Sequence, residues 1–255
     1  MRSAVRLEAV LFWLAVRYLT RLPVPRGLPE SDDLMVRAVK YHPGVGALVG
    51  AFAALVLWAG APVLPWPVVV LLSLAATLLV TGAFHEAGLA GAAEGLAAGR
   101  DRVEIIAMME RRQFGFYGAL AIGMGLALKL ALIAGFPLAV AAAALVAGHA
   151  TGRMAAVHVT ATTSHARSEG MQKFVPKVTA DGYRVALTLT LVALALLTAV
   201  TGIGAVLCGF AGAVLLGQAF RAWSVSRIGG YTGECLGGAE QMAELGFYLG
   251  LALWL

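Results

Sequence analysis

Charged residues are scarce in this sequence, and they are confined to a few segments between long apolar runs. Only 13% of the 255 residues are charged, whereas 60% are apolar. A soluble domain carries about 25% charged residues, so this chain has too few to cover a water-facing surface. Lipid must cover much of it, and the composition therefore predicts an integral membrane protein.

The apolar runs are long enough to cross a bilayer as helices. Crossing the hydrocarbon core takes roughly 20 mostly apolar residues, and about seven runs approach that length. Pro and Gly mark the turns between several of them, as at Pro62–Pro67 and Gly135–Pro137. The runs are 43–63, 66–84, 118–137, 139–158, 184–202, 204–220 and 238–255. We predict an all-α, polytopic membrane helix bundle of about seven transmembrane helices, forming one domain over residues 1–255.

The N-terminal segment differs from these runs. Glu8, Arg17 and Arg21 interrupt its apolar residues, and no small-residue cleavage site follows it cleanly. We expect residues 4–20 to form an amphipathic helix at the membrane interface rather than a cleaved signal peptide.

The charges gather on one side of the predicted bundle. All of the 19 Lys and Arg residues except Lys129 lie in the N-terminal segment, in the connections 85–117, 159–183 and 221–237, or at the span ends beside them. The 14 carboxylates are also expected on that side or within about one turn of it. Short basic connections mark the cytoplasmic face, so we expect these three polar loops and the working site there.

Two compositional features exclude other functions. The net charge of +5 comes without a basic tract or interleaved aromatic residues, so we expect no nucleic-acid partner. Cys208 and Cys235 have neither disulfide-framework nor metal-ligand spacing, and we expect small, at least partly buried side chains.

The first polar loop contains two carboxylates that could hold a metal ion. Glu86 and Glu94 are eight residues apart, so on a helix they would share a face. Mg²⁺ commonly binds one or two carboxylates together with substrate phosphates, and Gly88 would let a substrate approach the backbone. The alternative is a solvated helix end that follows a membrane span.

Several ionisable groups lie in or beside the apolar runs. They are His85, His149, His158 and Lys129. Embedded ionisable groups are candidates for a functional site. The alternative, which we favour for all four, is structural: histidines hydrogen-bonded between helices or at the interface, and a lysine that pairs with a neighbouring helix or snorkels.

The other two polar loops contain candidate phosphate contacts. Arg153, Arg167 and Lys177 could bind phosphate, although basic residues also accumulate here for topological reasons. In the third loop, Gly230, Thr232, Gly233 and Glu234 precede an apolar helix. Glycines at a helix N-terminus can turn backbone N–H groups toward an anion, and the alternative is a tight turn with close helix packing.

The chain resembles the cobalamin synthase family (adenosylcobinamide-GDP ribazoletransferase) nearly from end to end. The resemblance rests on the segments Tyr18–Pro25, Tyr41–Gly46, His85–Gly95, Gly115–Gly118, Arg153–Gly170 and Gly229–Gly237. It implies a multi-pass protein of the bacterial cytoplasmic (inner) membrane. It also implies a Mg²⁺-dependent phosphoryl transfer in which α-ribazole, or its 5′-phosphate, attacks adenosylcobinamide-GDP and GMP leaves.

On this resemblance, Glu86, Glu94 and Glu234 are the expected catalytic carboxylates, with Glu86 and Glu94 as metal ligands. Gly88, Arg153, Arg167, Lys177, Gly230, Thr232 and Gly233 are the expected substrate-binding residues. The expected partners are the corrinoid nucleotide, ribazole and the lipid bilayer. A homo-oligomer or a complex with other enzymes of the cobalamin pathway is compatible with the resemblance.

The sequence departs from the family where the chemistry is expected. Ala87, Gly91 and Glu94 stand where the family usually has three aspartates, and Glu234 stands where it has another. Arg111 and Arg112 begin the triplet that is Asp-Ser-Arg in the family. These changes leave open a catalytically impaired or non-catalytic homologue that binds corrinoid or scaffolds a membrane complex. A phosphotransferase acting on CDP-activated alcohols would require an Asp-Gly-x-x-Ala-Arg opening, which is missing.

Overall fold

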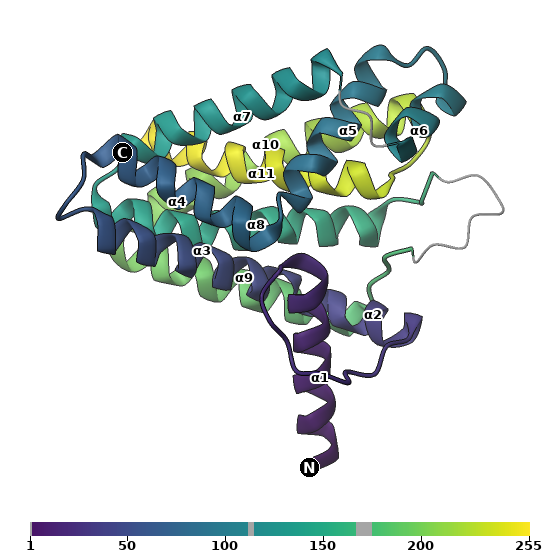
Figure 1. The fold of residues 1–255 in the computed structure, drawn as a ribbon, viewed down its shortest axis with the longest axis horizontal. Helices are drawn as coiled ribbons and strands as arrows, with labels where there is room; N and C mark the ends of the chain where they lie inside the picture. The colour runs from purple at the N-terminus through teal and green to yellow at the C-terminus, as the bar shows by residue number, and fades with distance from the viewer. Residues whose placement is uncertain (1, 112–114, 167–174) are drawn as a thin grey trace.

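The computed structural model describes residues 2–111, 115–166 and 175–255, and these are almost entirely helical (Figure 1). The elements in chain order are α1 (Arg2–Leu19), α2 (Asp32–Ala38), the 3-10 helix η1 (Val39–Tyr41), α3 (His42–Gly60), α4 (Trp66–Thr81), α5 (Phe84–Ala98), α6 (Arg102–Arg111), α7 (Phe116–Ala134), α8 (Leu138–Thr162), α9 (Ala180–Thr201), α10 (Ile203–Ile228) and α11 (Gly233–Trp254). The prediction of an all-α fold is confirmed.

The long helices lie alongside one another as a bundle (Figure 1). Among the described helices, five units are long and apolar enough to cross a membrane, namely Asp32–Gly60, α7, α8, α9 and α10. The bent pair α4–α5 supplies a sixth candidate. The run expected at 238–255 forms most of α11, but it also contains the polar residues Glu240, Gln241 and Glu244. The polytopic membrane architecture is thus confirmed, although α11 is not among the candidate spans.

The ends of the bundle differ in what they contain. Figure 1 places α5, α6 and the α10–α11 connection at one end, drawn on the right, and the C-terminus at the opposite end. The segment 221–237, expected to be a polar loop, is mostly helical, because α10 continues to Ile228 and α11 begins at Gly233. Gly229, whose backbone is in the left-handed region at φ 72°, ends α10.

A sharp bend separates α4 from α5, whose axes differ by 88°. Gly82 and Ala83 adopt left-handed conformations, at φ 66° and 54°. Two successive left-handed residues end α4 and redirect the chain. A side chain at Gly82 would collide with the guanidinium of Arg21. Because of this bend, α5 leaves the direction of α4 and packs against α7 and α11.

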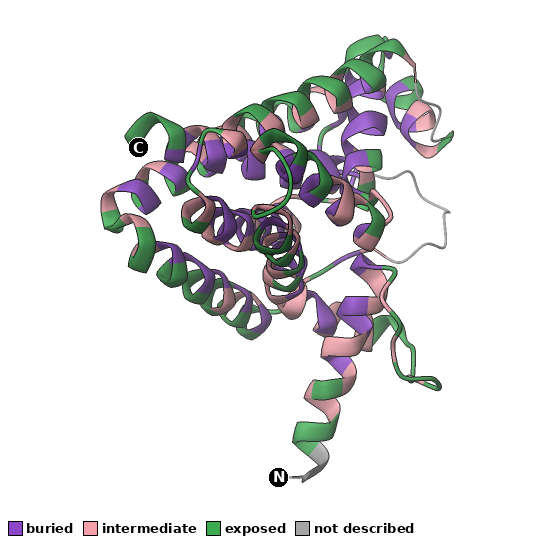
Figure 2. Ribbon diagram, turned by 60° about the vertical axis from the view of Figure 1, so that its left-hand side comes forward, coloured by how far each residue is buried: buried purple, intermediate pink, exposed green. Residues whose placement is uncertain are grey.

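Small residues let α11 approach its neighbours closely. A Cβ atom at Gly212 of α10 would collide with the carbonyl oxygen of Gly246, and one at Gly250 would collide with that of Cys208. Such small-residue contacts are typical of membrane helix packing. Buried residues line the surfaces where the helices face each other, and exposed residues cover the outside (Figure 2).

Cys208 is partly buried and Cys235 buried, and both are free thiols as expected.

Helix α1 crosses the direction of the long helices and projects from the bundle (Figure 1). Its inner end packs through Leu11, Leu14 and Leu19, which are buried. Glu8 anchors it to η1, since its Oε2 lies 2.6 Å from Lys40 Nζ and accepts a 2.7 Å hydrogen bond from the Tyr41 hydroxyl. The hydrogen bond from Lys40 lowers the pKa of Glu8, so the anchor is ionised at neutral pH.

Candidate active site at the contact of α5 and α11

The two motifs from the first and third polar connections meet where α5 packs against α11. A Cβ atom at Gly88 would lie 2.9 Å from Gly237 Cα, so the two backbones are in direct contact. Further along α5, a Cβ atom at Gly91 would lie 3.2 Å from Glu234 Cγ. Glycine is therefore required at 88 and 237 for this approach. The contact joins segments about 140 residues apart and places Glu234 beside one of the positions that lacks a carboxylate.

Glu234 lies in the first turn of α11 and is half-buried. Within the described residues, no hydrogen bond or ion pair engages its carboxylate. Burial, followed by the negative charge of Glu234, raises the pKa of Tyr18, which shows that this residue of α1 lies nearby. The Tyr18 ring stacks on His42 at 5.7 Å and meets the edge of Phe84 at 5.5 Å. A partly exposed carboxylate without a partner among the described residues can accept a proton from a bound substrate.

Glu94 faces a different neighbour. Its Oε2 accepts a 2.9 Å hydrogen bond from the backbone N–H of Gly118, in the first turn of α7. A carboxylate at a helix N-terminus satisfies an otherwise unpaired N–H group and interacts favourably with the helix dipole. The contact gives Glu94 a structural role, and its predicted role as a catalytic group and metal ligand remains a prediction.

We expect Glu94→Ala to lower the free energy of unfolding by about 1 kcal/mol, because the α7 cap is lost. Glu94→Gln should retain the stability, since its amide oxygen can accept the same hydrogen bond. Thermal unfolding in detergent measures both effects. An unchanged midpoint for Glu94→Ala would contradict the capping role. Loss of turnover in a fully stable Glu94→Gln protein would support the catalytic role as well.

Glu86 faces α11 rather than α7. Its Oε1 accepts a 3.1 Å hydrogen bond from Gln241 Nε2, and its buried Oε2 has no hydrogen-bond partner among the residues that the structure describes. Eight residues along a helix add two turns and roughly 80° of further rotation, which explains why Glu86 and Glu94 contact different helices. The unpaired buried oxygen of Glu86 fits a site for a cation or for a proton donor.

Around Glu86, a network of buried polar side chains, most of them ionisable, occupies the inside of the bundle. Its members come from α5, α7, α8 and α11 and are Glu86, Lys129, His149, Arg153, Glu240, Gln241, Glu244 and Tyr248. Lys129 Nζ lies 3.0 Å from Glu244 Oε2. Arg153 Nη1 lies 3.0 Å from Glu240 Oε1, and the Tyr248 hydroxyl donates a 2.9 Å hydrogen bond to Glu244 Oε1. Both ion pairs are almost fully buried, and they bind α7 and α8 to α11.

The network corrects one expectation from the sequence. Glu240 and Glu244 were expected within about a turn of the polar face, but both are 0% exposed inside the bundle. They can lie there because Lys129 and Arg153 supply positive charge from the facing helices. Lys129, expected to pair with a neighbouring helix or to snorkel, pairs with α11. His158, expected to bond between helices, lies 2.9 Å from the Tyr183 hydroxyl of α9.

One part of the network has the residue types of a metal centre. Single ligand atoms of His149, Glu240 and Glu244 lie within 4.8 Å of one another. Lys129 and Arg153, however, each lie 3.0 Å from one of these carboxylates. A divalent cation among them would be repelled by both positive charges. We therefore interpret these three residues as part of an internal ion-pair network.

The predicted phosphate-binding cations have different surroundings. Arg153 is 2% exposed, and its contacts are with protein groups, Glu240 and the carbonyl oxygen of His149. Lys177 is exposed, and Arg167 lies outside the described residues. Phosphate binding by these three residues stays a prediction.

Two other arginines connect segments of the polar end through hydrogen bonds. Arg102 of α6 donates to the carbonyl oxygens of Ile228, at 2.9 Å, and Ala166, at 2.6 Å. Arg227 of α10 donates to the carbonyl oxygen of Gly99 at 2.6 Å. Carbonyl groups at helix C-termini lack internal partners, and the guanidinium groups satisfy those of Ile228, at the end of α10, and Gly99, after α5. Some basic residues of the polar face are therefore structural.

The turn before α11 is held in place by its own polar groups. Thr232 caps α11, because its Oγ1 accepts a 3.3 Å hydrogen bond from the Cys235 N–H. A side chain at Gly230 would collide with the carbonyl oxygen of Ser164, whereas Gly233 is exposed with open space around it. Burial raises the pKa of Tyr231 to about 12, so its hydroxyl stays protonated and donates to the carbonyl oxygen of Pro176 at 2.9 Å. Of the predicted loop residues, only Gly233 presents open backbone to a ligand.

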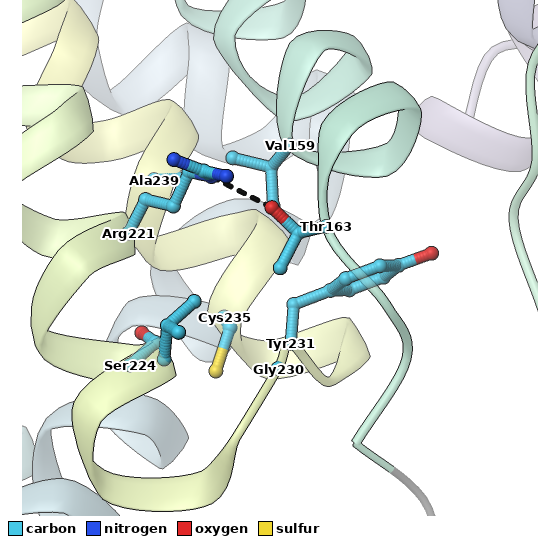
Figure 3. Close-up of a pocket in the computed structure, with 9 residues that line it drawn as sticks. Val159, Thr163, Arg221, Ser224, Gly230, Tyr231, Cys235 and Ala239 are labelled. Atoms are coloured by element: carbon cyan, nitrogen blue, oxygen red, sulfur yellow. Dashed lines mark hydrogen bonds between the residues drawn. The ribbon is translucent and has the colours of Figure 1, made fainter.

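A small hollow without room for a water molecule lies between α8, α10 and α11 (Figure 3). Val159, Thr163, Arg221, Tyr231 and Cys235 are among its lining residues. Arg221 Nε donates a 2.6 Å hydrogen bond across it to Thr163 Oγ1, so its guanidinium is held by the end of α8. Ligand pockets usually measure about 300–1,000 Å³, and this hollow is too small for a large substrate.

Comparison with known proteins gives a consistent result over the full length. The family model described as cobalamin-5-phosphate synthase matches residues 11–252. A protein of Ralstonia nicotianae named adenosylcobinamide-GDP ribazoletransferase is 41% identical, over 100% of this chain and 97% of its own length. Proteins of the same name from Shewanella amazonensis and Leptothrix cholodnii are 35% and 37% identical, and cover 98% and 95% of this chain. The two matches also extend over 98% and 95% of these relatives' own lengths. No solved structure matches.

Proposed function

This chain belongs to the cobalamin-5-phosphate synthase family, and we propose that it joins α-ribazole, or its 5′-phosphate, to adenosylcobinamide-GDP. A ribose hydroxyl oxygen forms a bond to the corrinoid-side phosphorus of the diphosphate. The bond from that phosphorus to the bridging oxygen breaks, and GMP leaves with this oxygen. The hydroxyl proton passes to a base. The transfer completes the nucleotide loop of adenosylcobalamin.

The observation that carries the proposal is the contact between the two family motifs, at Gly88 and Gly237. It brings Glu234, free of protein partners in the described residues, next to α5, whose Glu86 keeps one buried oxygen unpaired. We assign Glu234 as the proton acceptor and Glu86 as the group that faces the diphosphate. The hollow between α8, α10 and α11 has no room for a corrinoid nucleotide, so it does not compete with the α5–α11 contact as the proposed site.

Mg²⁺ is proposed as the cofactor on the basis of the residues present. The unpaired Oε2 of Glu86 is a suitable hard oxygen ligand, and Mg²⁺ sites often use one or two carboxylates plus substrate phosphates and water. When bound, the ion would neutralise charge that develops on the diphosphate. Glu86 would hold it, whereas Glu94, the second ligand predicted from the sequence, contacts α7 instead. Ala87 and Gly91 offer no carboxylate, so the site should bind the ion weakly.

The proposed reaction can be measured with purified protein in liposomes. With adenosylcobinamide-GDP, α-ribazole and Mg²⁺, we expect adenosylcobalamin and GMP in equal amounts, and no product after chelation of the metal. Binding of the corrinoid nucleotide without product at saturating Mg²⁺ would reject the transferase function. That result would favour the alternative, a non-catalytic homologue that binds corrinoid at the same site. Substrate added from each side of the membrane would test the proposed cytoplasmic location of the site.

Restoring a carboxylate should strengthen the metal site. Ala87 is exposed on α5, so Ala87→Asp fits without clashes. We expect this variant to lower the half-activating Mg²⁺ concentration by about tenfold, because a further negative charge would act at close range. Ala97→Asp, also exposed on α5, is the matched control and should have no effect. An equal response of both variants would show that position 87 does not face the metal.

A further inference from the structure

Gln241 connects Glu86 to the buried ion-pair network. Its Nε2 donates to Glu86 Oε1 at 3.1 Å and to Glu240 Oε2 at 2.8 Å. Its Oε1 accepts a 2.8 Å hydrogen bond from Lys129 Nζ. The side chain is only 6% exposed, so water does not compete for these contacts. One amide thus contacts α5, α7 and its own helix.

The surroundings fix the orientation of this amide. An ammonium group can only donate, so the Gln241 oxygen must face Lys129. With the oxygen directed at Lys129, the amide nitrogen faces Glu86 and Glu240 and donates to a carboxyl oxygen of each. A glutamate at this position would provide no donor and would add a negative charge beside two carboxylates. An apolar residue would remove the hydrogen bond to Glu86 and one contact each of Lys129 and Glu240, which would keep Glu244 and Arg153 as partners.

We propose that Gln241 is a positioning residue that holds Glu86 Oε1, so that Oε2 stays available to the metal–diphosphate group. This inference rests on the role of Glu86 in the proposed function. The buried, unpaired Oε2 is the atom that the amide leaves free. Hydrogen bonds to a ligating carboxylate fix its orientation, and their removal typically weakens metal affinity or activity by about 10–100-fold.

The restraint extends beyond a single hydrogen bond. Lys129 is itself held by Glu244, at 3.0 Å, and Glu244 by the Tyr248 hydroxyl, at 2.9 Å. Gln241 therefore links Glu86 to groups that are rigidly packed inside the bundle. A carboxylate restrained in this way needs no reorganisation when the charged substrate arrives. The network on α7 and α11 would thus set the geometry of a residue on α5.

Gln241→Glu tests the proposal, with Gln218→Glu as the matched control. Gln218 lies on α10, where its Oε1 already accepts a hydrogen bond from Arg221, so a glutamate is accommodated. We expect Gln241→Glu to raise the half-activating Mg²⁺ concentration by about tenfold or more, with the KM for the corrinoid nucleotide changed less than about threefold. The second readout uses no substrate: the Mg²⁺-induced rise in thermal midpoint should be present in the parent and in Gln218→Glu, and lost in Gln241→Glu.

The exchange variant Glu86→Gln with Gln241→Glu separates positioning from packing. It restores one amide and one carboxylate at the contact, with the carboxylate moved to α11. We expect its thermal midpoint to recover toward that of the parent, while the Mg²⁺ response stays lost.

Two results with the variants would overturn the proposal. One is a Gln241→Glu protein with the parent's Mg²⁺ response in both readouts. The other is an exchange variant that regains that response. Absence of turnover in the parent protein would reject the proposed function alone, since the substrate-free thermal readout still decides the role of Gln241. A parent midpoint that does not respond to Mg²⁺ would also reject the positioning role.

Discussion

Lys129→Met is expected to destabilise the protein by about 3–5 kcal/mol, since it removes one partner of a buried ion pair. Lys129 is 3% exposed and Glu244 is 0% exposed, so water cannot replace the lost contact. Gln241 also loses the donor to its Oε1. The network would then hold one cation, Arg153, against three carboxylates. We expect a large fall in the thermal midpoint in detergent and a low yield of folded protein.

A compensating variant tests whether charge imbalance causes the loss. Lys129→Met with Glu244→Gln removes one charge of each sign, and Gln can still accept the hydrogen bond from Tyr248. This double variant should recover at least half of the lost stability. Lys177→Met is the control, because Lys177 is exposed and surface changes usually stay within about 0.5 kcal/mol. A single variant as stable as the parent would contradict the network, as would a double variant no better than the single one.

Glu234→Gln is expected to lower turnover by about 100-fold or more, the usual contribution of a positioned acid or base. The amide has nearly the same shape but cannot take up the proton of the attacking hydroxyl. Among the described residues the Glu234 carboxylate has no partner, so the thermal midpoint should not change. This combination of lost turnover and retained stability distinguishes a chemical role from a structural one.

The control for this prediction is Glu104→Gln on α6. Glu104 accepts a 2.8 Å hydrogen bond from the backbone N–H of Arg100 and lies apart from the α5–α11 contact. Its replacement should leave turnover within about twofold of the parent, as expected of a surface change. Retention of more than about a tenth of the turnover by Glu234→Gln would exclude it as the general base.

The sequence predicted the membrane architecture because that depends on local properties. Span length, the Pro and Gly residues at turns, and the segregation of charge can each be read along the chain. The spacing of Glu86 and Glu94 correctly predicted one helix, α5, but the predicted shared face is wrong, because the two side chains contact different helices. Their different partners could not be read, because these depend on α5 lying between α7 and α11 after the bend at Gly82 and Ala83.

The ion-pair network was missed for a related reason. Lys129 and His149 were recognised as embedded ionisable groups, but each was considered alone. Glu240 and Glu244 are four residues apart on α11, and His149 and Arg153 are four apart on α8. This spacing puts each pair on one helix face, and it is the sequence feature from which the network could have been predicted. Only the packing of α7 and α8 against α11 shows which charges meet.

The most direct test concerns the face on which the motifs meet. Cysteines would be placed at the exposed positions Ala98 and Gly233, near the proposed site, and at Val63 and Ile203, at the other end of the bundle, after Cys208 and Cys235 are replaced by Ser. A membrane-impermeant maleimide is then added to sealed vesicles of each orientation. We predict that positions 98 and 233 react only from the cytoplasmic side, and positions 63 and 203 only from the opposite side. Labelling of 98 and 233 from opposite sides would contradict a shared site at the contact of α5 and α11.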